Sequence, residues 1–492
     1  MRVQGLRITG QTLFSEAELV AVAGFKPDSE LGVGDLRAMA AKITAHYNRR
    51  GYFLAQAYVP AQDAKAGTVT IAVVEGRYGT IRLNNQTNLS DRIANGIIAG
   101  LASGDVVATA PLERRLLLLS YIQGVTTRST LSPGAAVGTS DLSIDLTRGR
   151  RLTGSIDADN AGNRYTGATR AGGTVNLNNA AGIGDVLSLR VLTSFTGLAY
   201  ARASYQALVG KATVGAAFAH LDYALGREFE NLDASGNAEV ASLYASYPLV
   251  RSRDSNLYLL GGADAKWFED RIGASASVSN RRIQVGSIGL SGDSRDGFGG
   301  GGWNTYSANI AFGSLDIRNP VERAFDAATA RTNGGYGRLH LGGARLQAIT
   351  SDVSIYGAVR GQIAFNNLDI SEKMELGGAY AVRAYPQGEA FGDQGYVATV
   401  EARLSLDRLM PASAGHVQLF ALIDVGEVDF AKQPWMAGAN HARRSAYGAG
   451  ASWTTPGNFF VSATYARKLG DQPATSGPDA PGRFWFQVSK SF

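Results

Sequence analysis

From about residue 152 to the C-terminus, apolar or small residues alternate with polar residues in short runs. The run 458–467 shows this most clearly, with one face formed by Phe459, Val461, Ala463 and Tyr465 and the other by Phe460, Ser462, Thr464 and Ala466. Because successive side chains of a β-strand point to opposite faces, this period of two predicts strands. Counting such runs gives about sixteen strands, an even number typical of single-chain bacterial barrels.

Several of these runs carry a charged or amide side chain in the middle of the polar face. Arg202 and Gln206 alternate with the small residues of 199–207, and Arg190 lies between Leu189 and Val191. A barrel with lipid outside and water inside gives this pattern. A soluble β-sandwich or propeller also alternates, but the charges in mid-strand favour the barrel. The predicted fold is therefore mainly β, with a sixteen-stranded transmembrane antiparallel β-barrel at 151–492.

Residues 1–150 show a different pattern, in which strand-like and helix-like segments follow one another. Ser15-Glu16-Ala17-Glu18 has the form of a capping box, in which side-chain oxygens accept the free amides at a helix start. A second helix is predicted up to about Arg50, because apolar side chains recur there at helical spacing: Leu36, Met39, Ala40, Ile43 and Tyr47. Strands are predicted at 54–59 and 68–74.

Much the same order of segments then recurs at an interval of roughly 75 residues. Helices are predicted at 91–100 and 111–122. Pro111 fits the first turn of the second helix, because the backbone amide that proline lacks would have no partner within the helix there. We therefore expect two small α+β domains ahead of the barrel, at 1–77 and 78–150.

The composition suits a β-rich chain and excludes some kinds of site. The 61 glycines, 20 tyrosines and 19 phenylalanines fit many strands and turns. The absence of cysteine excludes disulfides and thiolate metal sites. The formal charge of +5 is modest for 492 residues and no run of Lys and Arg occurs, so nucleic acid is not an expected partner.

Catalytic and metal-binding patterns are missing from the sequence. The histidines are scattered without metal-ligand spacing, at His46, His220, His340, His416 and His441. Neither a Gly-x-Ser-x-Gly elbow nor a phosphate-binding loop with its Lys occurs. We therefore expect no catalytic residue, no metal and no cofactor, and we expect that the protein is not an enzyme.

Short motifs in the first 162 residues resemble a known family. Arg50-Gly51-Tyr52-Phe53-Leu54-Ala55, Pro60-Ala61-Gln62-Asp63 and Gly67-Thr68-Val69-Thr70-Ile71 are similar to the first polypeptide-transport-associated (POTRA) domain of two-partner secretion transporters. Leu131-Ser132-Pro133-Gly134 and Asp159-Asn160-Ala161-Gly162 resemble the second POTRA domain and its junction with the barrel. The resemblance implies an outer-membrane protein with both POTRA domains in the periplasm.

The same resemblance implies a function. The POTRA domains would capture an unfolded secreted exoprotein of the adhesin or cytolysin type, and the barrel would conduct it outward without nucleotide hydrolysis. One alternative is an assembly factor of the same superfamily that inserts other barrel proteins, although two periplasmic repeats rather than more argue against it. Another alternative is a passive porin, which would need no periplasmic repeats.

The Gly-rich interval 366–395 contains a further motif. Val382-Arg383-Ala384-Tyr385 resembles the Val-Arg-Gly-Tyr motif in the sixth extracellular loop of these transporters, with Ala384 in place of the glycine. Ile423-Asp424-Val425-Gly426 resembles the Asp-x-Gly motif of a barrel strand in the same family. The resemblance implies that loop 366–395 folds into the lumen, where Arg383 meets Asp424 in a latch that also includes Tyr385 and Gly426. On spacing alone, Arg383 could instead be a solvated loop residue and Asp424 a residue facing lumen water.

The last strand carries a second resemblance. Phe484, Phe486, Val488 and Phe492 share one face, and the chain ends on an aromatic residue. This pattern resembles the terminal signal by which outer-membrane proteins are recognised for insertion. It implies that outer-membrane lipid and the barrel assembly machinery are partners of this chain during biogenesis.

Overall fold

The computed structural model describes residues 1–62 and 67–492, so that Asp63, the last residue of the motif at 60–63, lies outside the described residues. The chain divides into two compact units, Met1–Gly149 with Ala181–Ile183, and Arg150–Ala180 with Gly184–Phe492. Within the described residues, no helix is both long and apolar enough to cross a membrane.

The first unit begins with two helices and two small sheets. Its elements are β1 (Arg2–Val3), β2 (Gly5–Thr9), α1 (Glu16–Ala23), β3 (Ser29–Glu30), α2 (Val33–Arg49), β4 (Gln56–Tyr58) and β5 (Thr68–Val74). One sheet is formed by β1 and β3. In the other, β2 pairs in parallel with β5, and β4 pairs antiparallel with the other edge of β5. The Ser15 hydroxyl accepts a hydrogen bond from Glu18 N at 3.2 Å and so caps α1. The apolar residues predicted at helical spacing in α2 are all buried in the core beside this sheet.

The rest of the first unit repeats this topology. Its elements are β6 (Arg77–Asn85), α3 (Asp91–Ile98), α4 (Thr109–Ser120), β7 (Val125–Pro133) and β8 (Thr139–Arg148). Again the first strand pairs in parallel with the last, and the strand between them in sequence lies antiparallel at an edge. Leu142, Ile144 and Leu146 of the central β8 are at most 1% exposed, which places the core on one face of this sheet.

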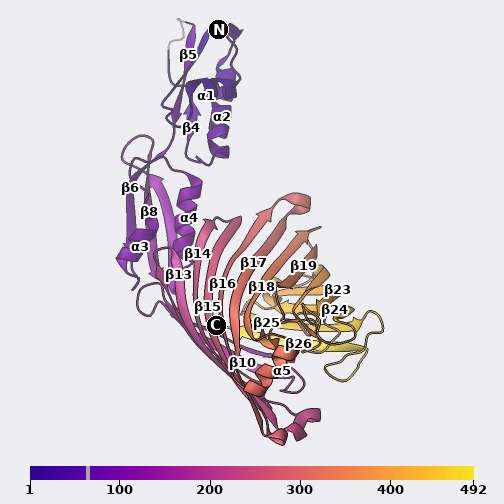
Figure 1. Ribbon diagram of the computed structural model, residues 1–492. Helices are drawn as coiled ribbons and strands as arrows, with labels where there is room; N and C mark the ends of the chain where they lie inside the picture. The colour runs from indigo at the N-terminus through magenta and orange to yellow at the C-terminus, as the bar shows by residue number, and fades with distance from the viewer. Residues whose placement is uncertain (63–66) are drawn as a thin grey trace. The chain divides into compact units, whose positions relative to one another are not determined.

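The second unit is a closed antiparallel barrel, whose consecutive strands lie side by side in Figure 1. Within residues 152–491, all of which the structure describes, the sixteen strands of the wall are β9 (Leu152–Asp159), β10 (Arg170–Asn178), β11 (Val186–Thr193), β12 (Leu198–Val209), β13 (Ala212–Ala224), β14 (Ala234–Arg251), β15 (Ser255–Ile272), β16 (Ser277–Asp296), β17 (Gly302–Ile317), β18 (Gly334–Ala348), β19 (Val353–Ala364), β22 (Gln394–Ser405), β23 (His416–Asp429), β24 (His441–Thr454), β25 (Phe459–Lys468) and β26 (Gly482–Ser491). The predicted mainly β fold with a sixteen-stranded antiparallel barrel is confirmed.

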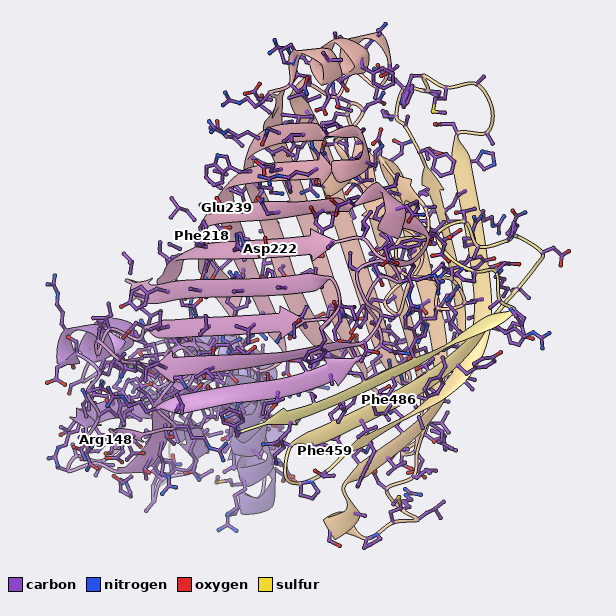
Figure 2. All side chains as sticks on the ribbon, turned by 90° about the horizontal axis from the view of Figure 1, so that it is seen from below. Arg148, Phe218, Asp222, Glu239, Phe459 and Phe486 are labelled. Atoms are coloured by element: carbon purple, nitrogen blue, oxygen red, sulfur yellow. The ribbon has the colours of Figure 1, made fainter. Side chains whose placement is uncertain are left out.

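Side chains alternate between the two faces of this wall. On β23, Ile423 is 56% exposed, whereas Asp424 is fully buried. Phe218 of β13 and Phe486 of β26, both labelled in Figure 2, also belong to the exposed outer face. On the opposite face, Arg190 pairs with Asp157 at an Nη1–Oδ1 distance of 2.9 Å. The outer face is therefore the apolar one that a barrel presents to lipid.

The seam between the last and first strands closes the barrel. The register of β26 on β9 runs from Gln487 opposite Asp159 to Ser491 opposite Ser155. Beyond this ladder, Phe492 and Gly154 exchange backbone hydrogen bonds with N···O distances of 3.0 and 3.1 Å. The C-terminal residue thus takes part in closing the wall.

One connection between wall strands contains an α-helix, and another contains a short β-ladder. α5 (Pro320–Ala328) lies between β17 and β18, where the Asn319 side chain accepts the Val321 amide and caps the helix. β20 (Met374–Glu375) and β21 (Phe391–Gly392) form a short antiparallel ladder in the connection between β19 and β22. This second connection contains the motif at 382–385.

Candidate functional site

The connection between β19 and β22 packs against the inner face of the barrel wall. Val382 and Tyr385 of this loop are fully buried, in one cluster with Val428 of β23 and Ala446 of β24. Val428 lies on the same face of β23 as Asp424, opposite the exposed Ile423. The loop therefore covers the inner surface of the last strands with apolar contacts, and it is not extended into solvent.

A tight turn presents Arg383 to the wall. Tyr385 N donates to the Val382 carbonyl at 3.1 Å, which places Arg383 and Ala384 at the centre of the turn. Ala384 is fully buried and does not have a positive φ. Alanine is therefore compatible with this backbone, although the motif that it resembles has glycine there.

The structure brings Arg383 and Asp424 together. Arg383 Nε donates to Asp424 Oδ2 at 2.8 Å and Nη2 donates to Oδ1 at 2.7 Å, and the backbone N of Arg383 adds a third bond of 3.1 Å to Oδ2. The planar guanidinium thus binds both carboxylate oxygens, the geometry for which arginine is best suited. Asp424 has no exposed surface, so this carboxylate is compensated by Arg383 rather than by water.

Arg383 also has partners that sequence reasoning missed. Its Nη1 donates to Glu401 Oε1 at 2.7 Å and its Nη2 donates to Thr399 Oγ1 at 2.8 Å, both on β22. Trp485 Nε1 of β26 donates to the Arg383 carbonyl at 2.6 Å. Alternation places Thr399 and Glu401 on one face of a strand, but only the register between strands brings that face to Arg383.

Tyr385 and Gly426, the other two residues predicted for the latch, also lie at this contact. A Cβ on Gly426 would lie 2.7 Å from Leu376 Cδ1 and 2.9 Å from the Tyr396 carbonyl oxygen, so only glycine allows the loop this close to β23. The Tyr385 hydroxyl donates to the Gln472 carbonyl at 3.0 Å. The Arg444 guanidinium lies over the Tyr385 ring, 5.2 Å from its centroid.

The beginning of the loop is held on other strands by pairs of opposite charge. Asp369 accepts from Arg281 of β16 at 2.5 Å. Glu372 pairs with Lys266 of β15 at 2.6 Å and with Arg338 of β18 at 2.8 Å. The loop is thus held on two sectors of the wall, β15–β18 and β22–β26.

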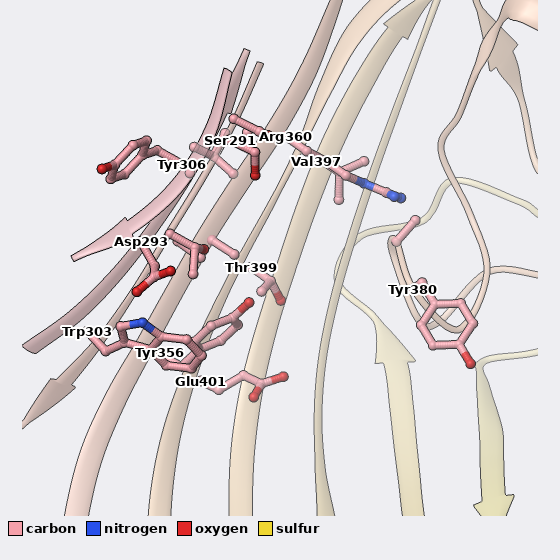
Figure 3. A pocket seen from close by; sticks show the side chains of 18 of the residues that line it. Ser291, Asp293, Trp303, Tyr306, Tyr356, Arg360, Tyr380, Val397, Thr399 and Glu401 are labelled. Carbon is pink, nitrogen blue, oxygen red and sulfur yellow. The ribbon is translucent and has the colours of Figure 1, made fainter. Parts of the chain in front are cut away.

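A cavity of about 700 Å³ lies between the loop and the inner wall. Figure 3 shows Tyr380 of the loop across this cavity from Trp303 of β17 and Tyr356 of β19. Arg360 lines the same space, and the Arg403 guanidinium lies 4.2 Å from the centroid of the Tyr356 ring. The cavity offers aromatic faces and both signs of charge beside Arg383. Within the described residues, no cluster of three or more His, Cys, Asp or Glu could hold a metal ion.

The residues of the predicted membrane-insertion signal lie on the outer face of β26 and just after it. Phe484, Phe486 and Phe492 are 55%, 41% and 44% exposed, and Val488 shares their face. Lys490 also lies on this face, and its ammonium donates to the Gly457 carbonyl. Recognition of these residues during insertion stays a prediction.

Comparisons with known proteins agree with this architecture. Residues 138–454 match the family of haemolysin secretion/activation proteins ShlB/FhaC/HecB, and residues 1–76 match the ShlB-type POTRA domain. The chain is 26% identical over 474 residues to the heme/hemopexin transporter protein HuxB of Haemophilus influenzae (strain 86-028NP), covering 94% of this chain and 82% of that protein. It is 22% identical over 441 residues to the outer membrane transporter CdiB of Dickeya dadantii (strain 3937), covering 87% and 76%.

A solved structure has the same fold. CdiB from Escherichia coli superposes with a TM-score of 0.78 at 21% identity, covering 100% of this chain and 90% of that chain. The family match spans more than half of the sequence and includes both Arg383 and Asp424. The chain therefore belongs to the haemolysin secretion/activation family ShlB/FhaC/HecB, the outer-membrane transporters that translocate partner proteins in two-partner secretion.

Proposed function

We propose that this outer-membrane transporter conducts its partner as an unfolded chain of the adhesin or cytolysin type through the barrel lumen, beside loop 366–395. Family membership gives the outer-membrane location, with POTRA domains in the periplasm, and the translocation of a partner protein. The bidentate contact between Arg383 and the fully buried Asp424 carries the finer proposal. It supports a latch that holds the loop against the wall while a path remains beside it.

The latch has a physical reason. A loop of this length loses much conformational entropy when it is fixed, so contacts that outweigh this loss are needed to keep it in place. A guanidinium stays charged at any relevant pH, and its fork fixes the direction of the carboxylate that it binds. In this proposal Arg383 and Asp424 hold the tip, and Gly426 lets Leu376 pack against the strand.

We assign capture of the client to two POTRA domains, at 1–77 and 78–150. β7 is an edge strand of nine residues that pairs only with β8 among the described residues. An extended peptide can add to such an edge through main-chain hydrogen bonds, whatever its side chains. This mode suits an unfolded client and needs no nucleotide.

The family relationship favours this function over the alternatives. HuxB and CdiB are transporters, which supports a non-enzymatic role without a cofactor. An assembly factor that inserts other barrels is not favoured, because the family match and the relatives similar in sequence are secretion transporters. A passive porin would leave the POTRA domains without a role. Lipid contact with the exposed outer face and recognition of Phe484, Phe486, Val488 and Phe492 by the barrel assembly machinery complete the proposed partners.

Reconstitution in proteoliposomes tests the proposal. The secreted polypeptide that disappears from the medium when this protein is removed would serve as the client, supplied unfolded and without nucleotide. We expect translocation by the natural chain and a clear decrease with Arg383→Ala or Asp424→Ala. Arg467→Ala, which removes an exposed guanidinium from the outer face of β25, is the matched control. Unchanged translocation and loop position in both latch variants would contradict the role of the latch.

A further inference from the structure

A second buried carboxylate holds the same loop at a different place. Glu389 lies six residues after Arg383 and is fully buried. Its Oε1 accepts from Arg444 Nε at 3.0 Å and from Arg444 Nη2 at 2.7 Å, on β24. A buried carboxylate is costly unless charge and hydrogen bonds compensate it, so a group so completely buried needs a specific set of partners.

The remaining partners of Glu389 come from the connection between β25 and β26. Thr475 N and Ser476 N donate to Oε2 at 2.8 and 2.9 Å, and the two hydroxyls add bonds of 3.0 Å each. Glu389 therefore accepts six hydrogen bonds, four of which come from residues 475 and 476. We call Glu389, Arg444, Thr475 and Ser476 the second latch.

A neighbouring contact ties the same two loops together. The Tyr385 hydroxyl donates to the Gln472 carbonyl at 3.0 Å, and Ala474 packs against the buried cluster around Val382 and Tyr385. Segment 469–481 thus covers the end of loop 366–395. It bonds to the loop through two side-chain hydroxyls, two backbone amides and one backbone carbonyl. Arg383 has no part in these bonds, because its partners lie on β22, β23 and β26.

We propose that Glu389 is a positioning residue, which fixes loop 366–395 independently of Arg383 and couples it to segment 469–481. The two latches act on different wall elements, so loss of one leaves the other formed. Displacement of the loop end then requires segment 469–481 to move with it. The importance of the second latch for transport rests on the proposed function, in which the client passes beside loop 366–395. The second latch itself can be tested without a client.

Cysteine labelling of the full-length protein separates the two latches, because the chain contains no cysteine. Ala381→Cys reports on the loop tip, where the alanine is 6% exposed, and Ala474→Cys reports on segment 469–481. Each reporter is combined with Glu389→Gln or Arg383→Ala, and labelling by a water-soluble maleimide is timed in lipid vesicles. Glu427→Gln, on the outer face of β23, is the matched control.

We expect Glu389→Gln to speed labelling at the Ala474→Cys reporter by about tenfold or more, the factor for losing one hydrogen bond to a charged group. Arg383→Ala should speed labelling at the Ala381→Cys reporter and leave the rate of labelling at the Ala474→Cys reporter unchanged. Thr475→Val keeps the backbone donor and loses only the hydroxyl, so its effect should be smaller than that of Glu389→Gln. Migration of unboiled protein on a denaturing gel confirms that each variant still forms a barrel.

The opposite pattern overturns the inference. Glu389→Gln would leave the Ala474→Cys reporter as protected as in the control, or Arg383→Ala would expose both reporters equally. Either result would mean that Glu389 does not fix the loop independently. Neither result depends on whether a client is translocated, so failure of the transport proposal is recognised separately.

Discussion

Glu75 shows at the scale of one residue how a buried carboxylate organises the end of the first sheet. It is 4% exposed and accepts from Thr12 N at 2.6 Å, from Leu13 N at 2.9 Å and from the Tyr47 hydroxyl at 3.1 Å. Burial raises the pKa of Glu75, but the hydrogen bonds from Thr12, Leu13 and Tyr47 outweigh it and hold the pKa below its ordinary value. Burial and the Glu75 charge raise the pKa of Tyr47, which keeps its hydroxyl a donor.

Because the folded-state pKa of Glu75 is lowered, its contribution to stability is present above the pKa of an unfolded Glu, about 4.3. This contribution is lost as the pH falls through the lower folded-state value. We expect the local stability near Thr12 to decrease in acid. Glu75→Gln should abolish this pH dependence, and near neutral pH it should lower the local free energy of unfolding by about 1–3 kcal/mol. Hydrogen exchange of the Thr12 and Leu13 amides, corrected for intrinsic rates, measures both. A pH dependence that persists in the variant would contradict the assignment.

Gly426 offers a steric test of the latch that leaves every charge in place. Gly426→Ala puts a Cβ 2.7 Å from Leu376 Cδ1 of the loop and 2.9 Å from the Tyr396 carbonyl oxygen of β22, so the packing of Leu376 against β23 must change. We expect a loss of about 1–3 kcal/mol in loop packing and faster maleimide labelling of an Ala381→Cys reporter. Gly261→Ala is the control, because a Cβ there meets no atom within 4 Å. Equal labelling in the two variants would show that Gly426 is not needed for close approach.

At the scale of the element, loop 366–395 is a charged segment inside a charged wall. It carries five acidic residues (Asp369, Glu372, Glu375, Glu389, Asp393) and two basic ones (Lys373, Arg383), a net charge of −3. Its carboxylates compensate Lys266, Arg281, Arg338 and Arg444 of the wall. We therefore expect the loop to influence both the electrostatic potential in the lumen and the width of the lumen.

Replacing residues 367–393 by a short turn should widen the pore and leave these wall cations facing water. We expect higher conductance and a shift of selectivity toward anions, measured as the reversal potential in planar bilayers under a KCl gradient. Arg383→Ala combined with Asp424→Ala removes one charge of each sign and so controls for loss of the latch alone. A wider pore with unchanged selectivity would contradict the electrostatic role of the loop.

The sequence predicts some parts of the fold and of the site but not others. The strands could be predicted, because polar and apolar side chains alternate within each strand. Arg383 and Asp424 were predicted through motifs that resemble a family. Thr399, Glu401 and Glu389 were missed, because strand register and loop packing decide their partners across the barrel. The ladder of β20 and β21 was also missed, since two residues per strand leave no periodic signal.

At the scale of the whole molecule, Phe492 takes part in closing the wall. Phe492 exchanges backbone hydrogen bonds with Gly154, and its exposed ring belongs to the predicted insertion signal. We expect Phe492→Ala to lower the yield of assembled barrel by removing the ring, and deletion of Phe492 to lower it further by removing the backbone bonds as well. The fraction of unboiled protein with shifted mobility on a gel measures the yield. Phe298→Ala, at an exposed residue between β16 and β17, is the control. If Phe492→Ala, the deletion of Phe492 and Phe298→Ala gave equal yields, neither the ring nor the backbone bonds of Phe492 would be needed for assembly.

The positions of the loop partners along the chain have a consequence for the order of assembly. Lys266, Arg281 and Arg338 precede the loop, whereas Asp424, Arg444 and Ser476 follow it, the last only a few residues before β26. A barrel that grows from its first strand would therefore fix the start of the loop early. The bonds from Thr475 and Ser476 to Glu389, and from Trp485 to the Arg383 carbonyl, would form only when the final hairpin is in place. Contacts that join distant parts of a chain form slowly. We therefore expect complete seating of the loop to be a late step in biogenesis, so that a pore without its last strands would hold this loop mainly by its beginning.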